Sequence, residues 1–221
     1  MITTTPGPGL ARYGAAWAYL AAFVVSNIIY VCLPPSSRLA LQSWASTNVA
    51  NLTHDPVGCL VVSAFIPSGS SIAWPALIAV ALFGASRVLG SWRTALVCAA
   101  GHVLGTLVSE GIVAYRISQG LLPQSDSRII DVGPSYVVVS ALAVAILYGG
   151  WLVRILEAVT LALMIFIGGI FSGLSTLQVA AIGHTTAIAV GASLGGFLAW
   201  RLRHRCRVSP GRPQAGEAKL R

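Results

Sequence analysis

The stretch DVGPSYVVVSAL, residues 131–142, places a glycine, a proline and a serine directly before an apolar run. An aspartate shortly before a proline is typical of a helix start, because a carboxylate there caps free N–H groups and suits the positive end of the helix dipole. The stretch therefore predicts a helix over residues 132–148, with Asp131 at its cap. It also leaves a question, since Ser135 would put a hydroxyl group just inside an apolar segment.

The composition around this stretch is that of a membrane protein. The chain has 221 residues, of which 56% are hydrophobic and 9% charged, and its mean hydropathy is +0.79. Ordinary soluble domains carry about 25% charged residues. The four cysteines lie far apart and form no CxxC pair, so we expect neither a metal site nor a redox motif.

Six apolar segments come close to the roughly 20 residues that cross a bilayer. Their backbones must be helical, because lipid cannot satisfy the polar groups of an open strand. The sequence therefore predicts an all-α membrane protein with six transmembrane helices. The expected spans are residues 12–33, 72–89, 92–115, 132–148, 152–171 and 177–200, within a membrane domain of residues 12–200 that follows an N-terminal segment, 1–11, and precedes a basic, disordered tail, 201–221.

The long first connection, residues 34–71, is more than a loop. Its segment CLVVSAFI, residues 59–66, is too short to span a bilayer but apolar enough to lie in the interface. The preceding segment, residues 39–52, has the mixed character of a surface helix. We therefore expect short interfacial helices here, with Asn48 and Asn51 serving as helix caps and turn residues.

The basic residues predict the orientation. If the N-terminus is cytoplasmic, eleven of the fourteen Lys and Arg residues fall on the cytoplasmic side, as the positive-inside rule requires. We therefore expect a multi-pass protein of the plasma membrane with both termini in the cytoplasm. Its expected partners are the lipid bilayer and transmembrane protein clients, and the tail lacks the interleaved aromatic residues of a nucleic-acid-binding segment.

In this topology Ser135 and His184 enter the membrane from the same outer face. Ser135 would lie roughly 5 Å deep and His184, in the sixth span, roughly 10 Å deep. A serine hydroxyl is a poor nucleophile until a base accepts its proton, and histidine suits that task near neutral pH. Each residue alone also has a structural explanation, as a packed serine or a hydrogen-bonded histidine.

Other residues could bring this pair together or support it. Gly191 and Gly195 give the sixth span a small-residue face on which another helix can pack closely. Glu110 lies at a similar depth and could orient His184, donate to an oxyanion when protonated, or pair with the first connection. His102 is expected to hydrogen-bond between helices.

A second carboxylate has a simpler expected role. Arg154 and Glu157, three residues apart in the fifth span, are expected to form a pair on the helix surface.

Taken together, the six spans, the serine motif GPSY and the pattern HTTAIAVG resemble the rhomboid intramembrane serine proteases, over about residues 12–200. This resemblance implies a rhomboid-like bundle, with Ser135 as the nucleophile and His184 as its base. It places Gly133 and Tyr136 on either side of the serine as supporting residues. It implies no cofactor and no metal.

The chain departs from the rhomboid pattern at four places. The second span lacks the His-x-x-x-Asn pair that helps to hold the oxyanion, and Pro134 has no backbone N–H. Tyr136 and Ala187 stand where glycine is usual. Two functions therefore follow from the sequence: an intramembrane serine protease that cleaves a membrane-embedded client near the outer face, or a catalytically silent rhomboid-fold protein that binds transmembrane segments.

Overall fold

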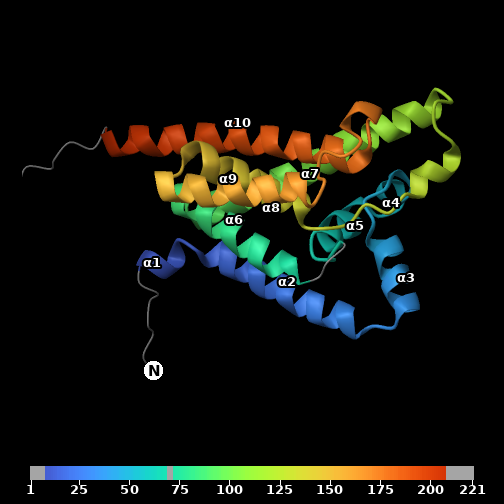
Figure 1. Ribbon diagram of the computed structural model, residues 1–221, viewed down its shortest axis with the longest axis horizontal. Coiled ribbons are helices and arrows are strands. Elements are labelled where there is room, and N and C mark those ends of the chain that lie inside the picture. Colours follow the sequence, from blue (N-terminus) through green and yellow to red (C-terminus); the bar gives the residue numbers. More distant parts are fainter. Residues whose placement is uncertain (1–7, 69–71, 208–221) are drawn as a thin grey trace, which may run out of the picture.

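The computed structural model describes residues 8–68 and 72–207, and within these ranges the chain is helical and contains no strand (Figure 1). Ten α-helices and two short 3₁₀ helices follow one another along the chain. The α-helices are α1 (Pro8–Ala11), α2 (Gly14–Cys32), α3 (Pro35–Ala45), α4 (Val49–His54), α5 (Pro56–Ser63), α6 (Ala73–Leu89), α7 (Ser91–Ser118), α8 (Ser135–Tyr148), α9 (Trp151–Phe166) and α10 (Val179–Arg207). The 3₁₀ helices are η1 (Gln124–Arg128) and η2 (Leu174–Thr176).

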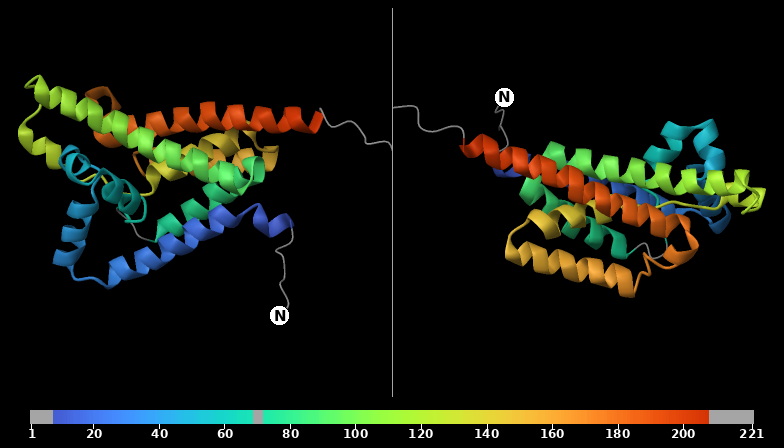
Figure 2. Two further views of the ribbon diagram at one scale, coloured as in Figure 1. Left: turned by 180° about the vertical axis from the view of Figure 1, so that it is seen from behind. Right: turned by 90° about the horizontal axis from the view of Figure 1, so that it is seen from above.

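Helix α8 forms the centre of the bundle. It packs against α6, α7, α9 and α10, and every residue from Tyr136 to Ala145 is buried. A helix that is hydrophobic all round is expected in such a position, because no face of it needs to meet a polar environment. Figures 1 and 2 show α6 to α10 gathered into one bundle, with α2 along one side and α3 to α5 at one end.

Among the residues that the structure describes, three helices are long and apolar enough to cross a membrane: α2, α7 and α10. Helices α6 and α8 are shorter apolar helices. The 14 residues of α8 extend about 21 Å at about 1.5 Å per residue, less than the roughly 30 Å of a hydrocarbon core. The chain is therefore an integral membrane protein, and the six-span count stays a prediction.

The first connection contains three helices, α3, α4 and α5. The surface helix expected over residues 39–52 is instead broken at residues 46–48, between α3 and α4. Asn48 caps α4, because its side-chain oxygen accepts from Asn51 N at 2.9 Å, while the Asn51 side chain donates to three backbone carbonyls. The expected capping role of both asparagines is confirmed.

The surface pair expected between Arg154 and Glu157 is not formed. The Arg154 guanidinium donates to the backbone oxygens of Gly149 and Leu147, which closes the C-terminal end of α8. Glu157 is buried, and its Oε1 lies where a Cβ atom on Gly84 of α6 would be. The three-residue spacing was compatible with both arrangements, and the missing side chain at Gly84 makes room for the buried one.

The predicted orientation can be tested with reporter fusions. Fusions after Arg93, Arg154 and Arg207 should report the cytoplasm, and fusions near Ser46 and Asp126 should report the outside, because basic residues are retained on the cytoplasmic side. Paired alkaline phosphatase and fluorescent-protein fusions measure this. A signal from outside the cell after Arg207 would contradict the orientation.

Helix α10 continues to Arg207, through the first seven residues of the segment that was expected to be a disordered tail. These seven residues are therefore helical.

Candidate functional site

The backbone before α8 passes tightly under the first connection. Gly133 has φ +137°, a conformation that side chains rarely adopt, and its N–H donates to Ser63 O at 3.0 Å. A Cβ atom on Gly133 would lie 2.6 Å from Ser68 Oγ. Pro134 then precedes α8, and Ser135 is its first residue, half-buried at the end of the bundle.

Asp131 ties this backbone to the first connection instead of capping α8. Its backbone N–H donates to Ser46 Oγ at 2.8 Å, and its backbone oxygen accepts from Thr47 N at 2.9 Å. Its carboxylate accepts from the hydroxyls of Tyr136 at 3.2 Å and Thr47 at 3.4 Å. Burial raises the pKa of this carboxyl above 3.8, and the two hydroxyl donors lower it in part. The expected cap is wrong, because no side chain caps α8.

The Tyr136 ring fills the space between α8 and α10. A Cβ atom on Gly183 would lie 2.1 Å from Tyr136 Cζ, and one on Gly105 would lie 3.3 Å from its Cδ2. The two glycines therefore form a slot for the ring. The ring meets His184 edge to face, with the ring centroids 5.1 Å apart.

His184 is buried, and one of its nitrogens is fixed by the backbone. Nδ1 lies 2.8 Å from Ile170 O, and because a carbonyl oxygen can only accept, this nitrogen carries the proton. Nε2 is then the unprotonated nitrogen. It has no hydrogen-bond partner among the residues described here, so the hydrogen bond expected with Ser135 is not formed.

Glu110 is buried on α7 and lies close enough to Asp131 and Tyr136 to interact with both electrostatically. Its Oε2 atom has no hydrogen-bond partner within the described part of the chain. The orientation of His184 comes from the Ile170 carbonyl. Glu110 instead interacts with Asp131 and, by a hydrogen bond, with the backbone of Val49 in the first connection, which is one of the roles expected for it.

His102 holds α7 to α5. Its Nε2 lies 2.9 Å from Leu60 O and 3.2 Å from Ser63 Oγ, so the expected hydrogen bond between helices is confirmed. Ser63 in turn accepts from Gly133 N through its backbone oxygen. His102 thus holds in place the part of the first connection that contacts the backbone just before α8.

The small residues of α10 face α8. A Cβ atom on Gly191 would lie 2.3 Å from Ser140 O, and one on Gly195 would lie 2.6 Å from Val144 Cγ2. Ala187 is fully buried between these helices. The close approach of α10 to α8 thus places His184 beside the first turn of α8.

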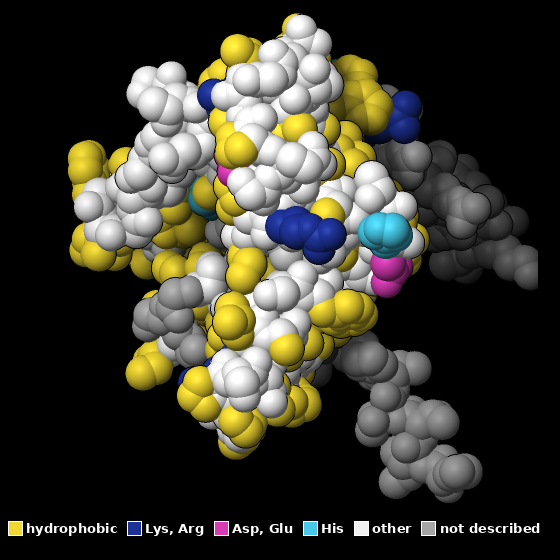
Figure 3. All heavy atoms as spheres, turned by 90° about the vertical axis from the view of Figure 1, so that its right-hand side faces the viewer, with side chains coloured by type: hydrophobic (Ala, Val, Ile, Leu, Met, Phe, Trp, Pro, Cys, Tyr) yellow, Lys and Arg dark blue, Asp and Glu magenta, His cyan; other side chains and the backbone are white. Residues whose placement is uncertain are grey.

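A cavity of about 470 Å³ opens beside this cluster. It lies between the segment that follows α7 and the start of α10, and Asp131 and Val179 both line it. Arg116 closes one side by donating to Thr176 O at 3.1 Å. Figure 3 looks onto this end of the molecule and shows charged side chains that are few and scattered. No three His, Cys, Asp or Glu side chains of residues 8–68 and 72–207 come together as metal ligands would.

The sequence did not indicate several of the groups that bind Asp131, Gly133 and His184. Ser46, Thr47 and Ser63 lie far from Asp131 and Gly133 in the chain, and the Ile170 partner is a backbone atom. The sequence offered no sign of these contacts, because serine and threonine in a connection are common and a carbonyl is present at every residue.

The first turn of α8 places the Tyr136 ring against the buried His184 of α10, and the Tyr136 hydroxyl donates to Asp131. This arrangement defines the class: a helical membrane protein with a polar site at one end of its bundle. A family model described as "Rhomboid-like protein" matches residues 11–201. The chain belongs to this family, as the resemblance of its motifs indicated. Neither a curated protein nor a solved structure matches the chain.

Proposed function

We propose that this protein is an intramembrane serine protease of the rhomboid type, with Ser135 as nucleophile and His184 as general base. One observation carries the proposal: His184 Nε2 is buried and unprotonated, with no partner among the described residues. An orphaned buried nitrogen costs free energy, and catalysis is a reason to retain it. The proposed substrate is a membrane-embedded client cleaved near the outer face.

In the proposed reaction the Ser135 hydroxyl gives its proton to His184 Nε2 while its oxygen attacks the client's peptide carbonyl. The proton then passes to the leaving amine, and water hydrolyses the acyl-enzyme with the same base. Ser135 reaches Nε2 only when the Tyr136 ring leaves the slot between α8 and α10. Hydrogen bonds of this kind are often long before substrate binds.

The start of α8 offers donors for the oxyanion in place of those that the rhomboid pattern loses. Pro134 has no N–H, but the first N–H groups of a helix, here those of Ser135 to Val137, have no acceptor within it. The hydrogen bond that opens α8 runs from Val138 N to Pro134 O at 2.9 Å. Such free N–H groups bind developing negative charge. The cavity beside Asp131 would admit a client segment to this turn.

A fluorophosphonate probe tests the proposal, since it needs an activated serine but no named client. Wild-type protein in detergent should label slowly, and labelling should disappear in Ser135→Ala and fall by about 100-fold or more in His184→Ala. In-gel fluorescence measures the rate, and a thermal unfolding curve of each variant controls for folding. Equal labelling of wild type and folded Ser135→Ala would end the protease proposal.

One observation favours the second candidate, a catalytically silent rhomboid-fold protein that binds transmembrane segments. The Tyr136 ring packs edge to face against His184 and fills the slot beside Gly183, so the base that Ser135 would need is covered on that side. Gly191 and Gly195 of α10 already pack against α8. The small-residue face of α10 is therefore occupied, and a client would have to bind to other helices. Absence of serine-specific labelling supports this candidate.

A further inference from the structure

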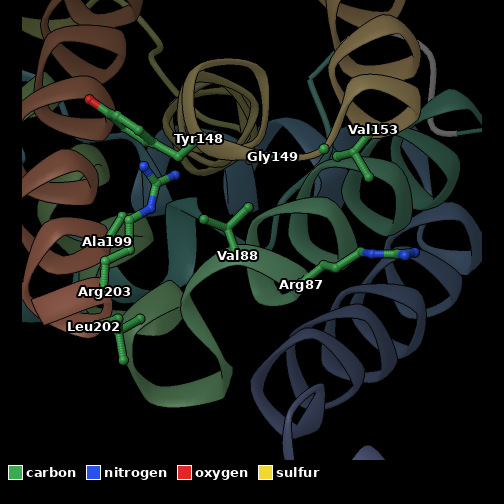
Figure 4. Close-up of a pocket in the computed structure, with 9 residues that line it drawn as sticks. Arg87, Val88, Tyr148, Gly149, Val153, Ala199, Leu202 and Arg203 are labelled. Carbon is green, nitrogen blue, oxygen red and sulfur yellow. The ribbon is translucent and has the colours of Figure 1, made fainter. Parts of the chain in front are cut away.

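The opposite end of the bundle contains a cavity of about 260 Å³ that is lined by two arginines (Figure 4). Arg87 comes from the last turn of α6 and Arg203 from the end of α10. Figure 4 shows Arg203 directed toward Tyr148, whereas the Arg87 side chain starts on the other side of Val88 and extends away from Arg203. The remaining lining residues are Gly149, Gly150, Val153, Ala199 and Leu202, and none of the lining residues is acidic.

Within the described part of the chain, both guanidinium groups lack a partner. Among residues 8–68 and 72–207, neither Arg87 nor Arg203 makes a side-chain hydrogen bond, an ion pair or a ring contact. Their neighbours differ, because Arg93 stacks on Trp92 and Arg201 stacks on Phe197. Two unpaired cations in one hollow favour an anion as its occupant.

The surrounding carbonyl groups do not oppose an anion. The C-terminal oxygens of α8 at this cavity are neutralised by Arg154, which donates to Gly149 O and Leu147 O at 2.8 Å each. Arg12 does the same for α6, where it donates to Ser86 O and Arg87 O. The positive charge of Arg87 and Arg203 therefore remains available to a ligand.

The cavity also lies at the depth of lipid headgroups. Trp92, Trp151 and Trp200 are exposed at this same end, where α7 and α9 begin and α10 leaves the bundle. Exposed tryptophans mark the boundary between hydrocarbon and headgroups. Beside the arginines, the cavity is lined by the apolar side chains of Val88, Val153 and Leu202. An acyl chain attached to the headgroup could pack against them.

We infer that this cavity binds the phosphate headgroup of an anionic phospholipid from the adjacent leaflet. Arg203 contacts the phosphate, and the exposed Arg87 side chain turns from its position at the rim to contact it as well. Its volume equals that of about nine waters at about 30 Å³ each, enough for a phosphodiester with its glycerol carbons. The site is independent of Ser135 and His184, which lie at the other end of the bundle.

The test measures binding of tail-labelled fluorescent phosphatidylglycerol to the full chain in a neutral detergent. Arg87→Gln with Arg203→Gln should weaken binding about 10- to 30-fold, since each arginine near a headgroup contributes about 1 kcal/mol. Arg93→Gln with Arg201→Gln removes the same charge from the same end and should change binding less than about twofold. Equal weakening in the two pairs, or none in either, would overturn the inference.

A competition arm distinguishes a lipid headgroup from free phosphate. Short-chain phosphatidylglycerol should displace the labelled lipid, and inorganic phosphate or glycerol phosphate at the same concentration should not. Equal displacement by the soluble phosphates would show a phosphate site and overturn the lipid assignment.

Discussion

Tyr136→Ala should label with a fluorophosphonate probe about 10- to 100-fold faster than wild type. In the proposed mechanism Ser135 meets His184 only after the buried Tyr136 ring has left its slot. Exposing such a ring costs about 1.5–3 kcal/mol, and each 1.4 kcal/mol changes a population about tenfold. Removing the ring removes that cost, so the reactive arrangement becomes more populated. The initial labelling rate, measured by in-gel fluorescence, gives the result.

Two control variants separate this effect from general loosening. Tyr136→Phe keeps the ring and loses only the hydroxyl, which donates to Asp131 at 3.2 Å and, at 3.5 Å, to Val179 O. It should label within about fivefold of wild type, because such a hydroxyl contributes about 1 kcal/mol or less. Tyr148→Ala removes another tyrosine of α8 that packs on α10, at the opposite end beside Gly196, and should not label faster. If Tyr148→Ala accelerates labelling as much as Tyr136→Ala, the ring is not the gate.

Gly183→Ala should destabilise the protein by about 3 kcal/mol, the largest stability effect that we expect from adding one methyl group. The new Cβ atom would lie 2.1 Å from Cζ and 2.2 Å from the hydroxyl oxygen of Tyr136. The ring is rigid and is closed in by Gly105 on α7, so the added methyl group either pushes the helices apart or forces the ring out of the slot, and both cost free energy. Thermal unfolding in detergent, followed by circular dichroism, should show the loss as a lower midpoint.

A second substitution tests the cause. In a Tyr136→Ala background the added methyl group meets no ring, so Gly183→Ala should then cost less than about 1 kcal/mol. Gly111→Ala is the matched control, because a Cβ atom on Gly111 of α7 has nothing within 4 Å. It should leave the midpoint unchanged or raise it slightly, as alanine is the better helix former. Equal destabilisation by Gly183→Ala in both backgrounds would contradict the slot.

The helices could be predicted from the sequence because long apolar runs leave few alternatives. The span expected over residues 12–33 is α2, Gly14–Cys32, and the one expected over residues 72–89 is α6, Ala73–Leu89. The ends of the helices could be predicted less closely. Helix α8 begins at Ser135, three residues later than expected, because Gly133 and Pro134 lie in the turn that is bound to α5.

The side-chain partners within the bundle could not be predicted in the same way. Glu157 was expected on the surface, but the absence of a side chain at Gly84 on another helix lets it be buried. Asp131 was expected to cap its own helix, whereas its partners Ser46 and Thr47 lie in the first connection. Such contacts depend on which helices pack together and at what angle. The spacing of residues within one helix contains no information on either.

The bonds between the first connection and Asp131 also set an order of events during biosynthesis. Ser46 and Thr47 are 83 to 85 residues away from their partners in the chain. Ribosomes add about 5–20 residues per second, so about 4 to 17 seconds pass between the synthesis of residues 46–47 and that of their partners. During this interval helices α3 to α5 lack the backbone that they later cover. These bonds can therefore form only after residues 129–131 have been made. A nascent chain that stops before Asp131 contains the whole first connection but lacks the backbone to which Ser46 and Thr47 bind.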